Sequence, residues 1–128
     1  MSRVVVDTSV LVDFLRRRDR KTTVLDALVD RAEHEFYISL ITHTELYSGS
    51  SVWERSQARR ELELVLAGFT ILPFSQEISE KAGWVRATYR LSPPDAIIAA
   101  TALEYGLPVL TFDVSDFKKV KGLKLFSL

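Results

Sequence analysis

The sequence predicts an α/β fold in which a mainly parallel sheet carries helices on both faces. Short apolar or β-branched runs alternate along the chain with longer segments of helical periodicity. The runs at residues 4–6 and 109–112 have no polar alternation, as expected for strands buried on both faces. The chain has 128 residues, of which 47% are hydrophobic, enough for one domain with one core. Strands that alternate with helices pair in parallel.

The individual elements follow from periodicity and from the residues that start and stop them. Glycine or proline follows several predicted elements, at Gly68, Pro73 and Gly106, and Ser75 and Ser92 are placed to begin helices. The expected strands are residues 4–6, 36–40, 69–72 and 109–112, with a further edge strand at 123–126. The expected helices are residues 10–15, 22–34, 42–49, 52–67, 75–89 and 93–105.

Composition excludes several classes of protein. The 17 basic residues balance the 17 acidic ones, so no overall charge favours a histone-like binder of nucleic acid. The absence of cysteine excludes disulfides and thiolate zinc sites. No signal peptide and no apolar run of the ~20 residues that span a membrane are recognisable. We therefore expect a cytoplasmic protein without a membrane partner.

Four carboxylates lie beside apolar segments where the backbone should turn: Asp7, Glu45, Asp95 and Asp113. Ligands of open α/β sheets bind beyond the carboxyl ends of the strands. Carboxylates that converge there repel one another unless a cation is present, and oxygen ligands suit Mg²⁺ or Mn²⁺. This pattern predicts a divalent-metal site for phosphoryl chemistry. It also predicts that neutralising Asp7 or Asp95 raises the thermal stability of the metal-free protein.

Each of these acidic residues also has a purely structural explanation. Side chains at helix starts accept hydrogen bonds from free backbone amides, and acidic residues are common in turns. The structural assignments are Asp7 as a helix cap, Thr42 with Glu45 and Ser92 with Asp95 as capping boxes, and Asp113 with Asp116 as turn residues. Capping and metal binding are compatible, because helix starts and strand ends also build the crevice.

Taken together, four segments resemble the PIN-domain nucleases, and in particular the small VapC-type toxins of prokaryotic toxin–antitoxin pairs. They occur in the family's order and span essentially the whole chain. The segments are VVDTSVLV at 5–12, THTELYSG at 42–49, DAIIAATA at 95–102 and TFDVSDF at 111–117. One departure is the entry to the third segment, where Pro93 and Pro94 replace the glycine-containing turn of many relatives.

The resemblance implies one nuclease domain over residues 1–128, folded as a three-layer α/β/α sandwich. It further implies a divalent-metal-dependent endoribonuclease that uses Mg²⁺ or Mn²⁺, acts as a toxin, and has RNA, a cognate antitoxin and a second copy as partners. The implied catalytic and metal-binding residues are Asp7, Glu45, Asp95 and Asp113, with Asp116 as an outer contributor and Thr8, Ser9 and Thr111 as supporting hydroxyls.

Roles within this site are assigned only in part. Glu45 either binds a second metal or orients the attacking water. Lys118 and Lys119 follow Asp113 closely and are the first candidates for contacts to RNA phosphates, although a solvated charged face also explains them. A phosphoaspartate enzyme would need a second aspartate where Ser9 stands. The remaining alternatives are an RNA-processing or DNA-cleaving PIN nuclease outside a toxin pair, and an inert PIN-fold binding module.

Overall fold

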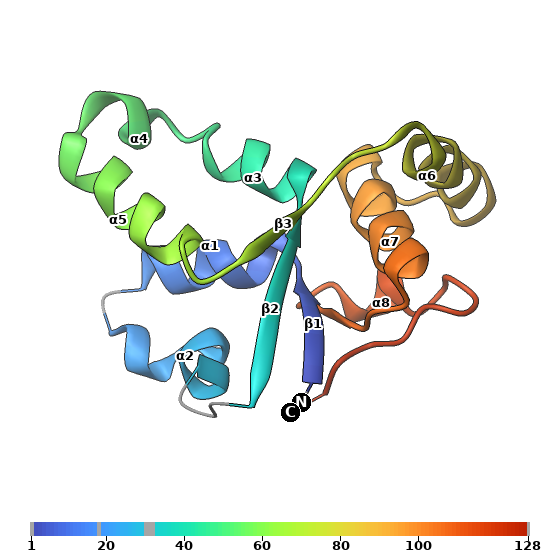
Figure 1. Ribbon diagram of the computed structural model, residues 1–128, viewed down its shortest axis with the longest axis horizontal. Coiled ribbons are helices and arrows are strands. Elements are labelled where there is room, and N and C mark those ends of the chain that lie inside the picture. Colours follow the sequence, from blue (N-terminus) through green and yellow to red (C-terminus); the bar gives the residue numbers. More distant parts are fainter. Residues whose placement is uncertain (1, 18, 30–32, 128) are drawn as a thin grey trace.

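The sheet has four strands, all parallel, in the order β3–β2–β1–β4 (Figure 1). This computed structural model describes residues 2–17, 19–29 and 33–127. The strands are β1 (Ser2–Val6), β2 (His34–Ser39), β3 (Thr70–Leu72) and β4 (Val109–Leu110). The mainly parallel sheet predicted from the sequence is therefore confirmed.

Helices cover both faces of this sheet. Figure 1 shows α1, α2 and α5 on one side of the strands and α6, α7 and α8 on the other, so the α/β/α sandwich is also confirmed. The helices are α1 (Thr8–Arg16), α2 (Val24–Val29), α3 (Leu40–Leu46), α4 (Ser50–Glu54), α5 (Ser56–Leu66), α6 (Gln76–Tyr89), α7 (Pro93–Tyr105) and α8 (Val114–Phe117). No helix in the described part of the chain combines the length and the apolar character needed to cross a membrane.

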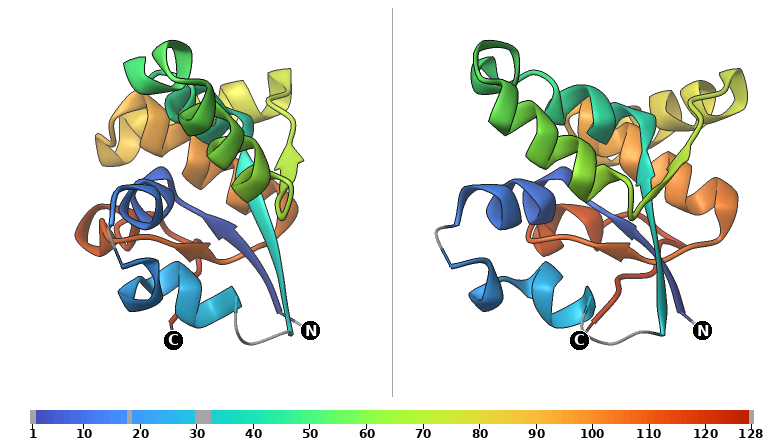
Figure 2. Two further views of the ribbon diagram at one scale, coloured as in Figure 1. Left: turned by 90° about the vertical axis from the view of Figure 1, so that its left-hand side faces the viewer. Right: turned by 60° about the vertical axis from the view of Figure 1, so that its left-hand side comes forward.

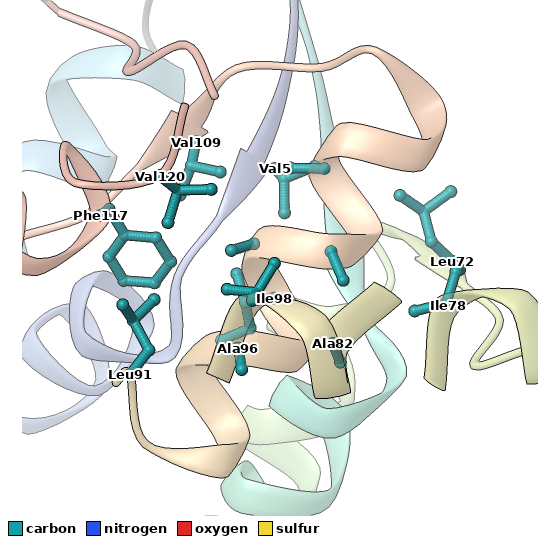
Figure 3. Close-up of a cluster of buried hydrophobic side chains, with 14 residues drawn as sticks. Val5, Leu72, Ile78, Ala82, Leu91, Ala96, Ile98, Val109, Phe117 and Val120 are labelled. Carbon is teal, nitrogen blue, oxygen red and sulfur yellow. The ribbon is translucent and has the colours of Figure 1, made fainter. Parts of the chain in front are cut away.

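The side chains of β1 point alternately into two hydrophobic cores, one on each face of the sheet. Val4 and Val6 pack with residues of α1 and α5, whereas Val5 faces the opposite core, where Ile98 of α7 and Phe117 of α8 lie (Figure 3). All five of these side chains are inaccessible to solvent. Burial of each large aliphatic or aromatic side chain is worth roughly 1.5–3 kcal/mol. The apolar run at the start of the chain thus anchors both layers and fixes where Asp7 emerges.

The strand order creates a switch point at the carboxyl end of β1. The chain leaves β1 toward β2 and β3 on one side and returns to β4 on the other. Loops that leave two adjacent strands in opposite directions open a crevice between them. Asp7 follows β1 directly, and its backbone N–H donates to Leu110 of β4 at 2.8 Å. α3 contacts both α1 and α7 and so joins the two helical layers near this end.

Several predicted elements have different boundaries. The helix expected at 52–67 is two helices, because Arg55 adopts an extended conformation (φ −125°, ψ 118°) between α4 and α5. The helix expected at 22–34 is reduced to α2 after a 3₁₀ turn at Arg20–Thr22. Of its remaining residues, 30–32 lie outside the described ones, and His34 begins β2.

The predicted C-terminal strands are also shorter than expected. β4 ends at Leu110, because the Thr111 hydroxyl donates to Asp7 at 2.7 Å and accepts from the Asp113 amide at 2.9 Å. These bonds turn the backbone out of the sheet. The edge strand expected at 123–126 is an isolated parallel bridge between Val109 and Leu125.

Candidate active site

Three of the four predicted carboxylates meet at the switch point. Asp7 follows β1, Asp95 lies in the first turn of α7, and Asp113 directly precedes α8. One carboxylate oxygen from each lies within 4.8 Å of the others. Asp7 is only 2% exposed, whereas Asp95 is half-buried and Asp113 is exposed. The inner end of the cluster, at Asp7, is therefore buried, and its outer side, at Asp113, is open to solvent.

Asp7 is held by three hydrogen bonds to its carboxylate. The Thr8 amide donates at 2.9 Å, the Ser9 hydroxyl at 2.8 Å and the Thr111 hydroxyl at 2.7 Å. The first of these bonds caps α1, so the capping role and the cluster role predicted for Asp7 coexist. Thr111 also accepts from the Asp113 amide and thereby ties the two acidic segments together.

Glu45 lies beside this trio and is bound to it through Thr8, whose hydroxyl donates to the Glu45 carboxylate at 2.7 Å. The capping box predicted for Thr42 and Glu45 is wrong. α3 begins at Leu40, and Ser39 caps it by accepting from the Ile41 amide at 3.3 Å. Glu45 is in the last turn, where a helix dipole disfavours a negative charge. Its position therefore has no explanation in helix capping.

The cap predicted at the start of α7 is confirmed. Ser92 accepts from the Asp95 amide at 3.4 Å, and Pro93 and Pro94 occupy the first helical positions, where no amide partner is needed. The two prolines that depart from many relatives are therefore compatible with the helix start. The Asp95 carboxylate remains directed to the cluster.

Burial and neighbouring negative charge raise the pKa values of two carboxylates in the cluster. Burial and the charge of Asp7 raise the pKa of Asp95 from 3.8 to about 6, with Asp113 and Glu45 adding to the effect. Burial also raises the pKa of Asp7, while its three hydrogen bonds oppose the shift. Within the described residues, no lysine, arginine or histidine forms an ion pair with any of the four carboxylates.

The donor set fits a hard divalent cation. It consists of carboxylate oxygens supported by hydroxyls, without nitrogen or sulfur ligands. Two oxygens that share one Mg²⁺ at about 2.1 Å are at most about 4.2 Å apart, so small side-chain movements bring the three carboxylates to a common ion. A cation there would offset the repulsion that raises the pKa of Asp95.

The other predicted residues lie around α8. Asp116 is outside the trio and forms an ion pair with Lys119, whose Nζ is 3.4 Å from its carboxylate. Lys118 is exposed. Asp116 as an outer metal contributor and the two lysines as RNA contacts remain predictions.

A groove that the sequence did not predict adjoins the site. It has a volume of about 260 Å³ and is bordered by α1, α3, α4 and α5, with Glu45 and Arg16 among the residues on its wall. Figure 2 shows α4 and α5 above α1 in both views. The groove depends on the break at Arg55, which turns α5 back toward α1. No sequence signal marked that break, because the helical spacing of residues 52–67 continues across Arg55.

Known proteins share this fold. The PIN domain family matches residues 4–123. Ribonuclease VapC1 of Rickettsia felis is 31% identical over 98% of this chain and 96% of its own length. A toxin–antitoxin complex from Klebsiella pneumoniae has a chain that is 31% identical, with a TM-score of 0.72 and coverage of 98% and 99%.

A structural likeness extends further than the sequence likeness. The structure of VapBC2 from Rickettsia felis bound to a DNA fragment from its promoter has a TM-score of 0.81 over 98% of both chains, at 19% identity. At that identity the likeness concerns the fold alone. The resemblance predicted from the sequence is confirmed, and the chain belongs to the PIN-domain family.

Proposed function

We propose that this protein is a divalent-metal-dependent endoribonuclease and the toxin component of a toxin–antitoxin pair. The observation that carries the proposal is the trio Asp7, Asp95 and Asp113 at the switch point, which has no neutralising side chain among the described residues. The relative named Ribonuclease VapC1 supports RNA as the substrate. The complex from Klebsiella pneumoniae supports an antitoxin partner.

The chain's own residues would bind and orient the reacting groups. Asp7, Asp95 and Asp113 would hold the cation, Mg²⁺ or Mn²⁺, which supplies charge neutralisation at the phosphodiester and activation of water. The hydroxyls of Ser9 and Thr111 keep the Asp7 carboxylate in place. Glu45, which lies outside the trio, would orient the attacking water or contact a second ion.

RNA would approach from the open side of the cluster, at Asp113 and the start of α8. Lys118 and Lys119 follow this short helix and are exposed, so they are the proposed phosphate contacts. Lys119 would exchange its ion pair with Asp116 for one with the backbone of the RNA. Because phosphate contacts are electrostatic, binding should weaken as salt is added.

The antitoxin partner is proposed from the toxin–antitoxin complex of the similar Klebsiella pneumoniae chain, and the second copy from the family resemblance. A cognate antitoxin and a second copy of the chain would associate with it in the cytoplasm, where the RNA substrate occurs. The groove beside Glu45 is a suitable place for a partner segment, because its wall carries both charges and apolar side chains: Arg16, Arg55, Glu61, Val12, Leu46 and Leu62. An inert binding module is disfavoured, because all four acidic positions are occupied.

Cleavage of total cellular RNA by the purified chain tests the proposal. The assay compares Mg²⁺, Mn²⁺ and EDTA, and the parent with Asp95→Asn. We expect cleavage only with metal, reduced at least about 100-fold in the variant. Loss of a hydrogen-bond partner of a ligand already costs about 10–100-fold, and Asp95 would bind the metal directly. Glu104→Gln is the matched control, since it removes a carboxylate at the far end of the same helix.

Two results would contradict this assignment. Cleavage by Asp95→Asn at the parent's rate would exclude the cluster as the site. Failure of the parent to bind Mg²⁺ or Mn²⁺ in calorimetry would exclude a metal centre, and Glu104→Gln distinguishes loss of this site from a general effect of removing charge.

A further inference from the structure

Thr42 is a buried polar residue for which helix capping gives no account. It lies in α3, its side chain is inaccessible to solvent, and α3 is capped by Ser39 instead. Its hydroxyl oxygen is 3.0 Å from the hydroxyl oxygen of Thr8. Within the described residues this is its single hydrogen-bond partner. A buried hydroxyl without a partner would cost about 1–3 kcal/mol, so this contact matters.

The direction of the bond follows from the number of hydrogens. Thr8 also contacts the Glu45 carboxylate at 2.7 Å. An ionised carboxylate only accepts, and a hydroxyl carries one hydrogen, so Thr8 gives its hydrogen to Glu45. Thr42 must then donate to Thr8. The three side chains form a directed chain of hydrogen bonds from Thr42 through Thr8 to Glu45.

We propose that Thr42 is a positioning residue that orients the Glu45 carboxylate through Thr8. The inference rests on the proposed nuclease function for its consequence, though not for its geometry. Thr42 fixes the Thr8 hydroxyl in one rotamer and polarises its O–H bond, which strengthens the bond to Glu45. Because Thr42 and Glu45 are three residues apart on α3, they lie on neighbouring sides of one rigid helix.

This chain of hydrogen bonds also connects α1 to α3 at the site. Thr8 begins α1, immediately after the capping residue Asp7, whereas Thr42 and Glu45 belong to α3. A change at Thr42 is therefore transmitted to the segment that carries Asp7, although no hydrogen bond joins Thr42 to the trio among the described residues.

The first test needs neither metal nor RNA. The side-chain carboxyl ¹³C resonance of Glu45, assigned with Glu45→Gln, is measured in EDTA for the parent, Thr42→Val and Thr42→Ser. We expect the resonance to shift in the valine variant and to return toward the parent in the serine variant, which keeps the hydroxyl. Thr44→Val is the matched control, because Thr44 is on the same helix but exposed, with its hydroxyl bonded to Leu40 at 3.3 Å.

The second test measures the consequence for cleavage. Loss of an outer hydrogen-bond partner typically costs 10–100-fold in activity, and we expect Thr42→Val to lower kcat about tenfold with KM unchanged. Because Thr42 acts through Thr8, the double variant Thr8→Val with Thr42→Val should lose no more than Thr8→Val alone. Additive losses would overturn the proposed route through Thr8.

The two tests separate the failure of this inference from that of the proposed function. An unchanged Glu45 resonance in a folded Thr42→Val protein overturns the role of Thr42, whatever the nuclease assay shows. If Thr42→Val shifts the Glu45 resonance but the parent cuts no RNA, the hydrogen-bond chain is supported and the nuclease function is contradicted. If Thr42→Val does not fold, Thr42→Ala, which removes the hydroxyl without placing a methyl group in its space, provides the same resonance test.

Discussion

Carboxylates on the outer surfaces of the helices form ion pairs, whereas the carboxylates at the switch point lie close to one another. On the outer surfaces, Asp13, Glu61 and Glu104 each pair with an arginine or lysine at 2.9–3.1 Å. At the switch point, Asp7, Asp95 and Asp113 are brought together without any such pair among the described residues. The chain as a whole is neutral, so this difference reflects placement and not a shortage of cations.

The comparison shows what distinguishes a binding site from a stabilising network. Exposed ion pairs contribute little to stability, about 0–1 kcal/mol each, because water already solvates both partners. A partly buried carboxylate among like charges costs free energy, in keeping with the raised pKa of Asp95, to which burial contributes most and the charge of Asp7 next. Sites that bind charged ligands commonly retain such unfavourable arrangements. This cost fits the proposed cation site, and it should be measurable without the ion.

The largest effect on stability is expected for the substitution of Asp7, and its sign is opposite to that expected for Asp95. Asp7→Asn should destabilise the metal-free protein by about 1–3 kcal/mol. An amide nitrogen in place of either carboxylate oxygen cannot accept, so the variant loses the bond from Thr8 or the bonds from Ser9 and Thr111. This revises the expectation from sequence that neutralising Asp7 stabilises the fold. Thermal unfolding in EDTA measures the difference, and an increase in Tm would show that repulsion outweighs these hydrogen bonds.

Asp95→Asn should have the opposite sign, with a clear dependence on pH. The folded protein holds the Asp95 proton more tightly than the unfolded chain, so the stability from this group is complete below about pH 4. It is lost as the pH rises from 3.8 through about 6. In EDTA at pH 7.5 the variant should therefore melt a few degrees above the parent, and the gap should close near pH 4.

A pH-independent difference would contradict the repulsion that we attribute to the cluster. Added Mg²⁺ should stabilise the parent above pH 6 and have less effect on Asp95→Asn, because binding to the folded state alone raises its stability. The same titration therefore measures both the effect of the Asp95 charge on stability and the binding of Mg²⁺.

The smallest effect is expected on the outer surface. Lys81→Ala breaks the pair with Glu104 on α7, where both side chains are well exposed, and should change the free energy of unfolding by no more than about 0.5 kcal/mol. Chemical denaturation measures this. A loss above 1.5 kcal/mol would mean that the outer pairs are a stabilising network after all, and the contrast with the switch point would be weakened.

The convergence of three of the four predicted carboxylates could be predicted because these residues are adjacent to recognisable apolar runs. Asp7 follows a buried strand and Asp95 follows a serine–proline helix start, and both positions are set locally. Asp113 was predicted although β4 is shorter than expected, because the turn that begins at Thr111 still directs it to the site. The supporting roles of Ser9 and Thr111 were implied only by the family resemblance.

Local reasoning failed where two explanations used the same residues. Thr42 and Glu45 match a capping box, yet Ser39 caps the helix, which begins at Leu40, two residues before its predicted start. The pair instead contacts Thr8. The continuous pattern from 52 to 67 gave no sign of the break at Arg55, since a helical periodicity persists across a single extended residue. The groove beside Glu45 was therefore not predictable.

By itself, the sequence determined the class of fold, the order of the elements and the identity of the acidic residues, because periodicity, caps and motif order are local properties of the chain. Tertiary structure alone decided which of these residues meet. The trio forms because β4 returns to the side of β1 opposite β2, and Glu45 is drawn in by a hydroxyl 37 residues away in the chain. Contacts between residues far apart in sequence depend on strand order and helix packing, which no local pattern encodes.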